Sequence, residues 1–180
     1  MGDVSKVISG SGAVYVAAET VAIPNLSGNP TSDFSAFTAI GYTEDGVEID
    51  YQATDTEIRV DEESFPVDVL IDKESASVSV KMAETEMQNL FFAITGATFT
   101  GGNTIDFGGL PRPNIFRVGF SGPAPTTNKT REMILYRTYA KSALKMHYKR
   151  NAKVMYQVQF MALADSTQPV NERAGKIKDF

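Results

Sequence analysis

Residues 47–53 have the sequence VEIDYQA, in which apolar and polar side chains alternate strictly. Val47, Ile49 and Tyr51 fall on one side of an extended chain, and the acidic residues between them fall on the other. A period of two with a single apolar face is typical of a half-buried β-strand. The same alternation returns at 65–71, 76–82, 144–148 and 154–162. Strands therefore dominate the predicted fold.

The connections between the first strands differ in length. A stretch of eleven residues, 54–64, separates the first two strands and contains five acidic side chains. These residues are Asp55, Glu57, Asp61, Glu62 and Glu63. The next connection, 72–74 with the sequence DKE, predicts a tight hairpin between two short strands.

One segment changes from a strand period to a helix period. Its apolar side chains at i, i+3, i+4 and i+7 are Met87, Leu90, Phe91 and Ile94. Thr85 with Gln88 three residues later forms a potential capping box, and Gly96 is a potential stop signal. The spacing predicts one short helix over 86–95 that packs on a sheet.

The last third of the chain is rich in β-branched and aromatic residues, which favours strands over 131–140 and 144–148. Shorter strands are predicted around 105–107 and 115–121, between glycines and prolines. A helix is the competing interpretation of the last third, because its basic side chains recur every four residues from Arg137 to Lys149. Strands are preferred because tyrosine and threonine are poor helix formers.

Many short strands with one helix predict an all-β (mainly β) sandwich or barrel with one short flanking α-helix. Residues 1–35 are rich in serine, glycine and asparagine and are predicted to be an amino-terminal arm. Residues 36–165 form the predicted β-sandwich domain, and residues 166–180 form a carboxy-terminal tail.

The chain has 180 residues, no cysteine and one histidine, His147. The absence of cysteine excludes disulfides, thiolate metal sites and thiol nucleophiles, and a single histidine excludes sites that need two imidazoles. The sequence contains neither a phosphate-binding glycine loop nor a nucleophile elbow. We therefore predict no catalytic, cofactor-binding or metal-binding residues, and expect the protein not to be an enzyme.

The net charge of −5 conceals a strong asymmetry. Residues 1–90 carry a net charge of −13, whereas residues 91–180 carry +8. Such asymmetry indicates a surface for nucleic acid, an acidic partner or another copy of the chain, unless folding mixes both halves on every face. The candidate basic partner surface consists of Arg137, Lys141, Lys145, Lys149, Arg150 and Lys153. Direct DNA binding is disfavoured by the acidic first half.

Four segments in order carry a family resemblance. They are 40–49 (IGYTEDGVEI), 66–69 (PVDV), 77–85 (SVSVKMAET) and 159–165 (QFMALAD). Together with the acidic stretch 54–64, they resemble bacteriophage major tail tube proteins over residues 38–96 and 131–165. Residues 97–130 have no counterpart in this resemblance.

The resemblance implies a tail-tube-like β-sandwich that assembles with itself into hexameric rings, which stack into a hollow tube for genome delivery. It implies a tape measure protein and tail terminator or tip proteins as partners, and DNA that passes through the lumen without specific binding. The stretch 54–64 resembles the loop that reaches the adjacent ring. Glu48 and Asp50 are the candidate lumen acids, because acidic side chains would repel passing DNA.

Two alternatives remain open from the sequence. One is another head-to-tail structural protein, such as a connector, a tail terminator or a decoration protein, and the other is a β-sandwich binding module of a virion. No run approaches the roughly 18 apolar residues of a membrane span, so we expect no membrane anchor. The expected location is the virion tail, after assembly in the host cytoplasm.

Overall fold

A computed structural model describes residues 11–109, 111–125, 129–141, 144, 146, 148, 150 and 153–180. This part of the chain is mainly β, an antiparallel sandwich with a short helix beside it, as predicted. Its elements are β1 (Ala13–Ala18), α1 (Pro30–Asp33), β2 (Thr38–Ala39), β3 (Thr43–Ile58), β4 (Asp68–Met82), α2 (Met87–Ala93), β5 (Ala97–Thr100), β6 (Thr104–Phe107), β7 (Phe116–Pro123), β8 (Thr130–Ala140), β9 (Tyr156–Ala162), the 3-10 helix η2 (Val170–Glu172) and β10 (Gly175–Asp179).

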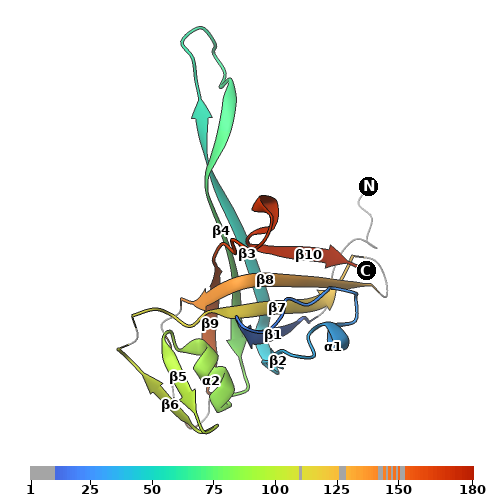
Figure 1. Ribbon diagram of the computed structural model, residues 1–180, viewed down its shortest axis with the longest axis vertical. Coiled ribbons are helices and arrows are strands. Elements are labelled where there is room, and N and C mark those ends of the chain that lie inside the picture. The colour runs from blue at the N-terminus through green and yellow to red at the C-terminus, as the bar shows by residue number, and fades with distance from the viewer. Residues whose placement is uncertain are drawn as a thin grey trace.

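Strand β8 joins the two layers of the sandwich because it pairs with different strands along its length. One edge pairs with β7, and the other pairs first with β10, over Arg131–Leu135, and then with β9, over Thr138–Ala140. The strand order is β2-β1-β7-β8-β9-β4-β3. In Figure 1, β3 and β4 run along the long axis of the molecule, whereas β1, β7, β8 and β10 cross it. The sheet therefore bends over itself.

The main core lies between these two layers. Val14 and Val118 from the crossing strands belong to one cluster with Val78, Val158 and Phe160 from β4 and β9, and each is at most 1% exposed. Fully burying one such side chain contributes about 1.5–3 kcal/mol. The apolar face that the alternation predicts in 76–82 and 154–162 is thus the buried face.

The hairpin predicted at 72–74 is wrong. Strand β4 continues through this triplet, and the chain turns instead between Ile58 and Asp68. The register shifts between the pairs Thr54–Lys73 and Asp55–Ile71, so Asp72 is the extra residue of a β-bulge. Polar residues do not end a strand that is exposed on both faces, and this triplet contains no glycine or asparagine to form a two-residue turn. The result is one long hairpin.

The predicted terminal segments are corrected in the same way. Within the predicted amino-terminal arm, residues 1–35, strand β1 pairs with β7 in the main sheet, and its Val16 is fully buried. Residues 1–10 lie outside the described residues. Within the predicted tail, β10 pairs with β8. A Cβ atom on Gly175 would lie 2.3 Å from the Ile134 carbonyl oxygen, so only glycine allows this close pairing. Both segments belong to the folded body.

Helix α2 is shorter than the predicted 86–95. Glu86, not Thr85, occupies its N-cap position, and no side chain caps the helix. Gly96 adopts a φ of 68°, which fits its predicted role as a stop signal. The buried residues are Asn89, Phe92 and Ala93, while the predicted stripe is only half-buried. Phe92 and Ala93 pack in the main core, and Asn89 donates hydrogen bonds to the carbonyls of Ile40 and Glu84 in the adjacent connections.

The remaining strand predictions divide into two groups. The strands expected at 105–107, 115–121, 131–140 and 154–162 are present as β6, β7, β8 and β9. The strand expected at 144–148 is not, since Leu144, Met146 and Tyr148, its described residues, lie outside any strand. A second, one-turn helix, α1, accompanies α2 and was not predicted.

Candidate functional site

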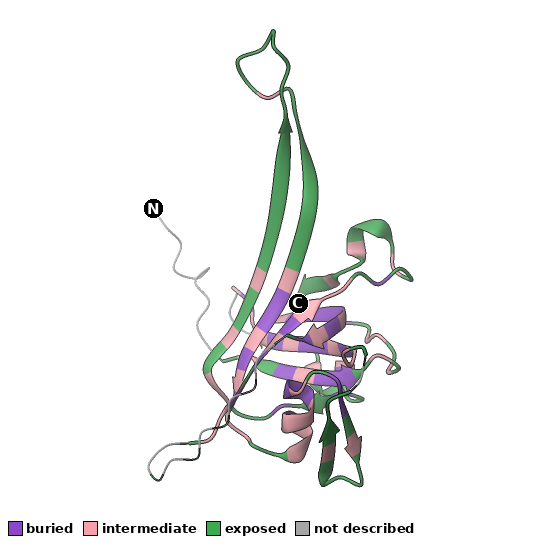
Figure 2. Cartoon of the chain, turned by 90° about the vertical axis from the view of Figure 1, so that its left-hand side faces the viewer, coloured by how far each residue is buried: buried purple, intermediate pink, exposed green. Residues whose placement is uncertain are grey.

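The outer part of the β3–β4 hairpin extends far from the body of the protein. We call residues 51–75 the arm. Every residue of the arm is exposed except Pro66, which is half-buried. Figure 2 shows this as a continuous green ribbon beyond the purple core. An isolated two-stranded hairpin is at best marginally stable in water, and the described part of the body gives the arm no packing that would stabilise it.

Large apolar side chains are exposed on both faces of the arm. Phe65 is 80% exposed, Leu70 54% and Ile71 63%. Successive residues of a strand point to opposite faces, so Leu70 lies on one face, and Val69 and Ile71 lie on the other. Strands that read as continuous apolar runs are normally covered on both sides. On the arm, none of the described residues covers these apolar side chains.

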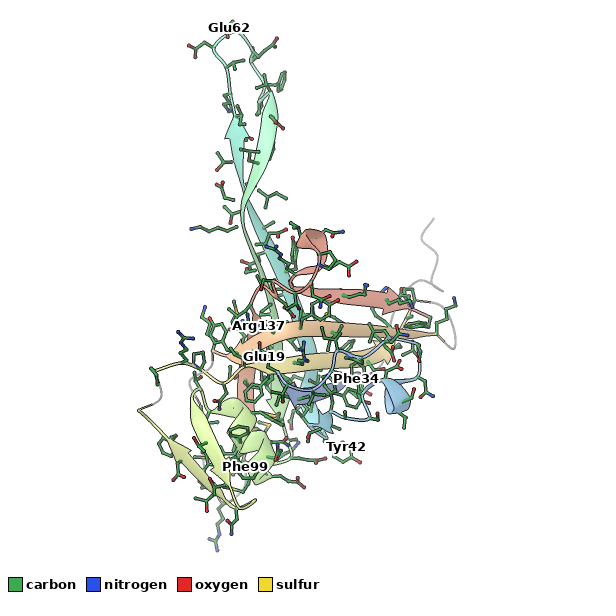
Figure 3. All side chains as sticks on the ribbon, viewed as in Figure 1. Glu19, Phe34, Tyr42, Glu62, Phe99 and Arg137 are labelled. Carbon is green, nitrogen blue, oxygen red and sulfur yellow. The ribbon has the colours of Figure 1, made fainter. Side chains whose placement is uncertain are left out.

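The five predicted acidic residues of stretch 54–64 all lie on the arm. Asp55 and Glu57 are on β3, and the others are at the tip, where Figure 3 labels Glu62. Residues 54–74 contain eight acidic and two basic residues. Arg59 pairs with Glu57 at 2.6 Å, and the Tyr51 hydroxyl donates to Glu74 at 2.6 Å, which raises the pKa of Tyr51. The arm thus combines apolar surface with negative charge.

A groove of about 630 Å³ lies where the arm leaves the body, and we call it the root groove. One wall comes from the root of the hairpin, the floor from β8, and the opposite wall from the segment 170–177. The large apolar residues that line it include Ile49, Tyr51, Met133, Leu135, Val170 and Ile177. Arg173 and Lys176 also line it, together with Glu74 and Glu172. The groove is the open end of the space between the two layers.

The predicted basic surface is partly occupied by partners within the chain. Arg137 pairs with Glu19 at 2.6 Å, as Figure 3 shows, and Lys153 pairs with Glu44. Lys141 and Arg150 are exposed. Lys145, Lys149 and His147 lie outside the described residues. The structure therefore gives Arg137 and Lys153 a role in holding segments of the body together.

The predicted lumen acids lie on the polar face of the β3–β4–β9 layer. Glu48 pairs across the ladder with Ser79, and Asp50 pairs with Ser77, so acids and serines share this face. Nearby, Lys81 donates to Asp45 at 2.5 Å, and this hydrogen bond lowers the pKa of Asp45. Gln157 and Gln159 of β9 continue the polar face. The sequence pattern correctly placed Glu48 and Asp50 together, opposite to the core.

The sequence did not reveal two neighbouring carboxyl groups, the buried Glu132 and the half-buried Asp33. Glu132 on β8 is 0% exposed, and one of its oxygens accepts a hydrogen bond from the Gly28 N–H at 3.1 Å. Asp33 accepts hydrogen bonds from the backbone N–H and the hydroxyl of Ser27, at 2.6 and 2.7 Å. The signal that could have found Glu132 is an acid directly before the apolar run 133–136.

Burial is the main cause that raises the pKa of Glu132, and the neighbouring Asp33 adds to it, while the Gly28 N–H and Lys178 act in the opposite direction. Although burial opposes it, the hydrogen bonds from Ser27 lower the pKa of Asp33. When Glu132 is protonated, its hydroxyl can donate a hydrogen bond to the Asp33 carboxylate. This hydrogen bond gives the second Glu132 oxygen a partner. This pair ties segment 27–33 to β8.

Glu132→Gln is expected to remove a loss of stability at high pH. A raised folded-state pKa means that the folded chain holds the proton more tightly than the unfolded chain. The stabilisation is complete below the ordinary value of 4.5 and is lost as pH rises through the raised pKa. Glutamine keeps a donor toward Asp33 at every pH. Urea unfolding between pH 5 and about 9 should therefore show a smaller decline for the variant than for the natural chain.

Glu63→Gln at the tip of the arm is the matched control, since it makes the same chemical change at an exposed position. It should leave the pH profile of stability unchanged. Equal profiles for the natural chain and Glu132→Gln would contradict the assignment of a proton to Glu132. The opposite shift of Asp33 does not interfere, because its contribution is lost only as pH falls below the ordinary value of 3.8.

Among the described residues, no group of three or more histidine, aspartate or glutamate side chains is arranged to hold a metal ion. Within the same part of the chain, no helix has the length and apolar character needed to cross a bilayer. A comparison with protein-family models finds no match, and a comparison with curated proteins finds no relative.

Proposed function

We propose that the protein is the structural subunit of a bacteriophage tail tube, in which copies form stacked, hexameric rings around a lumen that conducts DNA into the host. The observation that carries this proposal is the arm, an acidic hairpin with large apolar residues exposed on both faces. The four sequence segments that resemble major tail tube proteins, and the β-sandwich on which they lie, agree with it.

The arm favours assembly in a repeating, head-to-tail manner. If the arm of one copy contacts the body of a second copy, and that second copy sends its own arm to a third, the two surfaces in each contact differ. Such heterologous contacts generate closed rings or continuing stacks rather than simple two-fold dimers. Long unpaired strand edges favour the same outcome, since β3 pairs with β4 alone among the described strands. An edge that is a liability in a monomer becomes a joint in an assembly.

The polar face of the β3–β4–β9 layer is the proposed lining of the lumen. Its acids, Glu48 and Asp50, would repel the phosphates of DNA, so that the duplex slides without being held. Serine side chains on β4 add hydrogen-bonding groups without positive charge. The tape measure and terminator or tip proteins enter this proposal as partners, and the virion tail as the location, both through the family resemblance.

Electron microscopy of the purified protein at high concentration tests the proposal directly. Long, uniform, hollow tubes are the expected result. Single rings that do not stack would favour a connector or terminator, and monomers that bind glycans would favour a binding module of the virion. Either of these last two results would overturn the tail tube proposal.

Reversing both lumen acids, with Glu48→Lys and Asp50→Lys, is expected to make assembled tubes bind DNA. Each new lysine adds a phosphate contact that releases counterions, so binding should be strong at low salt and weaken steeply as salt rises. Retention of a labelled DNA duplex on a filter with the tubes measures this. Tubes of the natural chain should retain little DNA at any salt concentration.

A charge-matched control is the double reversal of Glu62 and Glu63 to lysine at the tip of the arm. It changes the net charge by the same amount at a site away from the polar face. Equal DNA retention by both variants would show that net charge, and not the lining, decides retention. A map of assembled tubes with lysine or arginine lining the lumen would also contradict the assignment.

A further inference from the structure

The root groove has two walls that a single strand could contact at once. One wall is the apolar face of the hairpin root, with Ile49 and Tyr51, and the other is the segment 170–177, with Val170 and Ile177. These four side chains are between 43% and 80% exposed. On the groove floor, Met133 and Leu135 are buried members of the main core. The groove thus continues the space between the two layers outward and leaves it open.

The arm has the complementary construction. Its β4 side carries Val69 and Ile71 on one face and Leu70 on the other, and Val67 lies just before them. An element that is apolar on both faces matches a groove with two apolar walls, because insertion covers both faces together. A strand laid on a flat surface would leave one of these faces in water.

The arm of one chain cannot enter its own groove. The β3–β4 ladder is paired from Val47–Val80 at the root to Ile58–Asp68 near the tip, interrupted only by the bulge at Asp72. Folding back would break this ladder, and Figures 1 and 2 show the arm directed away from the body. An arm that enters the groove must therefore come from another molecule.

The charge of one wall and the volume of the groove fit an arm. The arm carries eight acidic and two basic residues over 54–74. Exposed Arg173 stands on the 170–177 wall, where it can meet an acid that flanks the inserted strand. Lys176 on the same wall pairs with Glu172 at 3.0 Å, and Asp50 and Glu74 line the opposite wall, so the main contact with the arm is apolar. The volume of about 630 Å³ lies within the roughly 300–1,000 Å³ that holds whole organic ligands, so it accommodates several aliphatic side chains.

We propose that the root groove is the receptor for the arm of a second copy of this chain, with Val69, Leu70 and Ile71 of the arm seated between the hairpin root and β10. This inference rests on the proposed function, since it identifies the joint by which successive subunits are linked. Each chain then gives one arm and receives another, so the contact can repeat without limit.

Cysteine cross-linking tests the joint on a clean background, because the chain contains no cysteine. Val69→Cys on the arm and Ile177→Cys in the groove are combined in one chain. Both positions are more than half exposed, so the substitutions should not disturb folding. Mild oxidation after assembly is expected to give a ladder of dimers, trimers and longer chains on a non-reducing gel, with the 69–177 link identified by mass spectrometry of the joined peptides.

The control combines Val69→Cys with Phe107→Cys, which is 73% exposed on β6 at the end of the body opposite the arm. It should give no 69–107 link. Tubes that form without a 69–177 link would overturn the groove as the receptor and leave the tail tube proposal intact. A 69–177 link in a mixture that stops at dimers would support the groove and overturn the tail tube proposal. A 69–177 link within single chains would overturn the joint.

Discussion

Replacing residues 54–73 with Asn-Gly abolishes tube growth and leaves the body folded, if the arm is the joint between subunits. Ala53 and Glu74 are cross-strand partners, so a two-residue turn closes the shortened hairpin in its natural register. The removed residues are exposed apart from Pro66, so the body loses no buried core side chain. Sedimentation and electron microscopy measure assembly, and circular dichroism measures folding.

The expected effect is large because each joint loses several apolar side chains at once. Burial of even one aliphatic residue is worth about 1.5–3 kcal/mol. Every 1.4 kcal/mol changes a binding constant about tenfold, so each joint should weaken by many orders of magnitude. Tubes of unchanged length from the shortened chain would contradict the role of the arm.

A matched control keeps the arm but neutralises its tip, with Asp61→Asn, Glu62→Gln and Glu63→Gln. Exposed charges steer association more than they hold a complex together. This variant should therefore still form tubes, with an assembly rate that depends less on salt than that of the natural chain. If it failed to assemble, charge at the tip, and not apolar contact, would be the main source of affinity.

The arm shows what local patterns predict well and where they fail. Alternation in 47–53 correctly predicted a strand with Glu48 and Asp50 on its polar face. Its apolar face is less buried than the pattern predicts, because Val47 packs against the core whereas Ile49 and Tyr51 are exposed. Beyond residue 53 no core exists, so polarity no longer reports the position of a turn. Asp72 was therefore assigned to a turn, although it lies in a bulge of a continuous strand.

Other features depend on contacts between distant parts of the chain. Ile49 and Ile177 line the same root groove from opposite walls, and the carboxyl groups of Asp33 and Glu132 interact. No pattern within a short window encodes such contacts. Residues 1–35 were predicted to lie outside the β-sandwich for the same reason, since their many serines and glycines outweighed the buried strand residues Val14 and Val16. Their partners on β7 are about a hundred residues away in sequence.

The same substitution, phenylalanine to alanine, should have opposite consequences in the core and on the arm. Phe160 is fully buried on β9, where Val78 and Ala140 are its cross-strand partners and Phe116 lies edge-on with ring centroids 6.4 Å apart. Phe160→Ala should cost about 3–5 kcal/mol of unfolding free energy, which is the usual cost of such a cavity. This is a large part of the roughly 5–15 kcal/mol that stabilises a typical domain.

Phe65, by contrast, is 80% exposed on the arm. Phe65→Ala should change the unfolding free energy of the monomer by no more than about 0.5 kcal/mol, as is usual for exposed positions, while it weakens tube growth. Urea unfolding at low concentration and sedimentation at high concentration measure the two effects separately. If Phe65→Ala destabilised the monomer as much as Phe160→Ala, the apolar residues of the arm would serve the fold of their own chain. If it affected neither property, Phe65 would lie outside the joint, and the apolar contacts would be confined to the β4 side of the arm, where Val69, Leu70 and Ile71 lie.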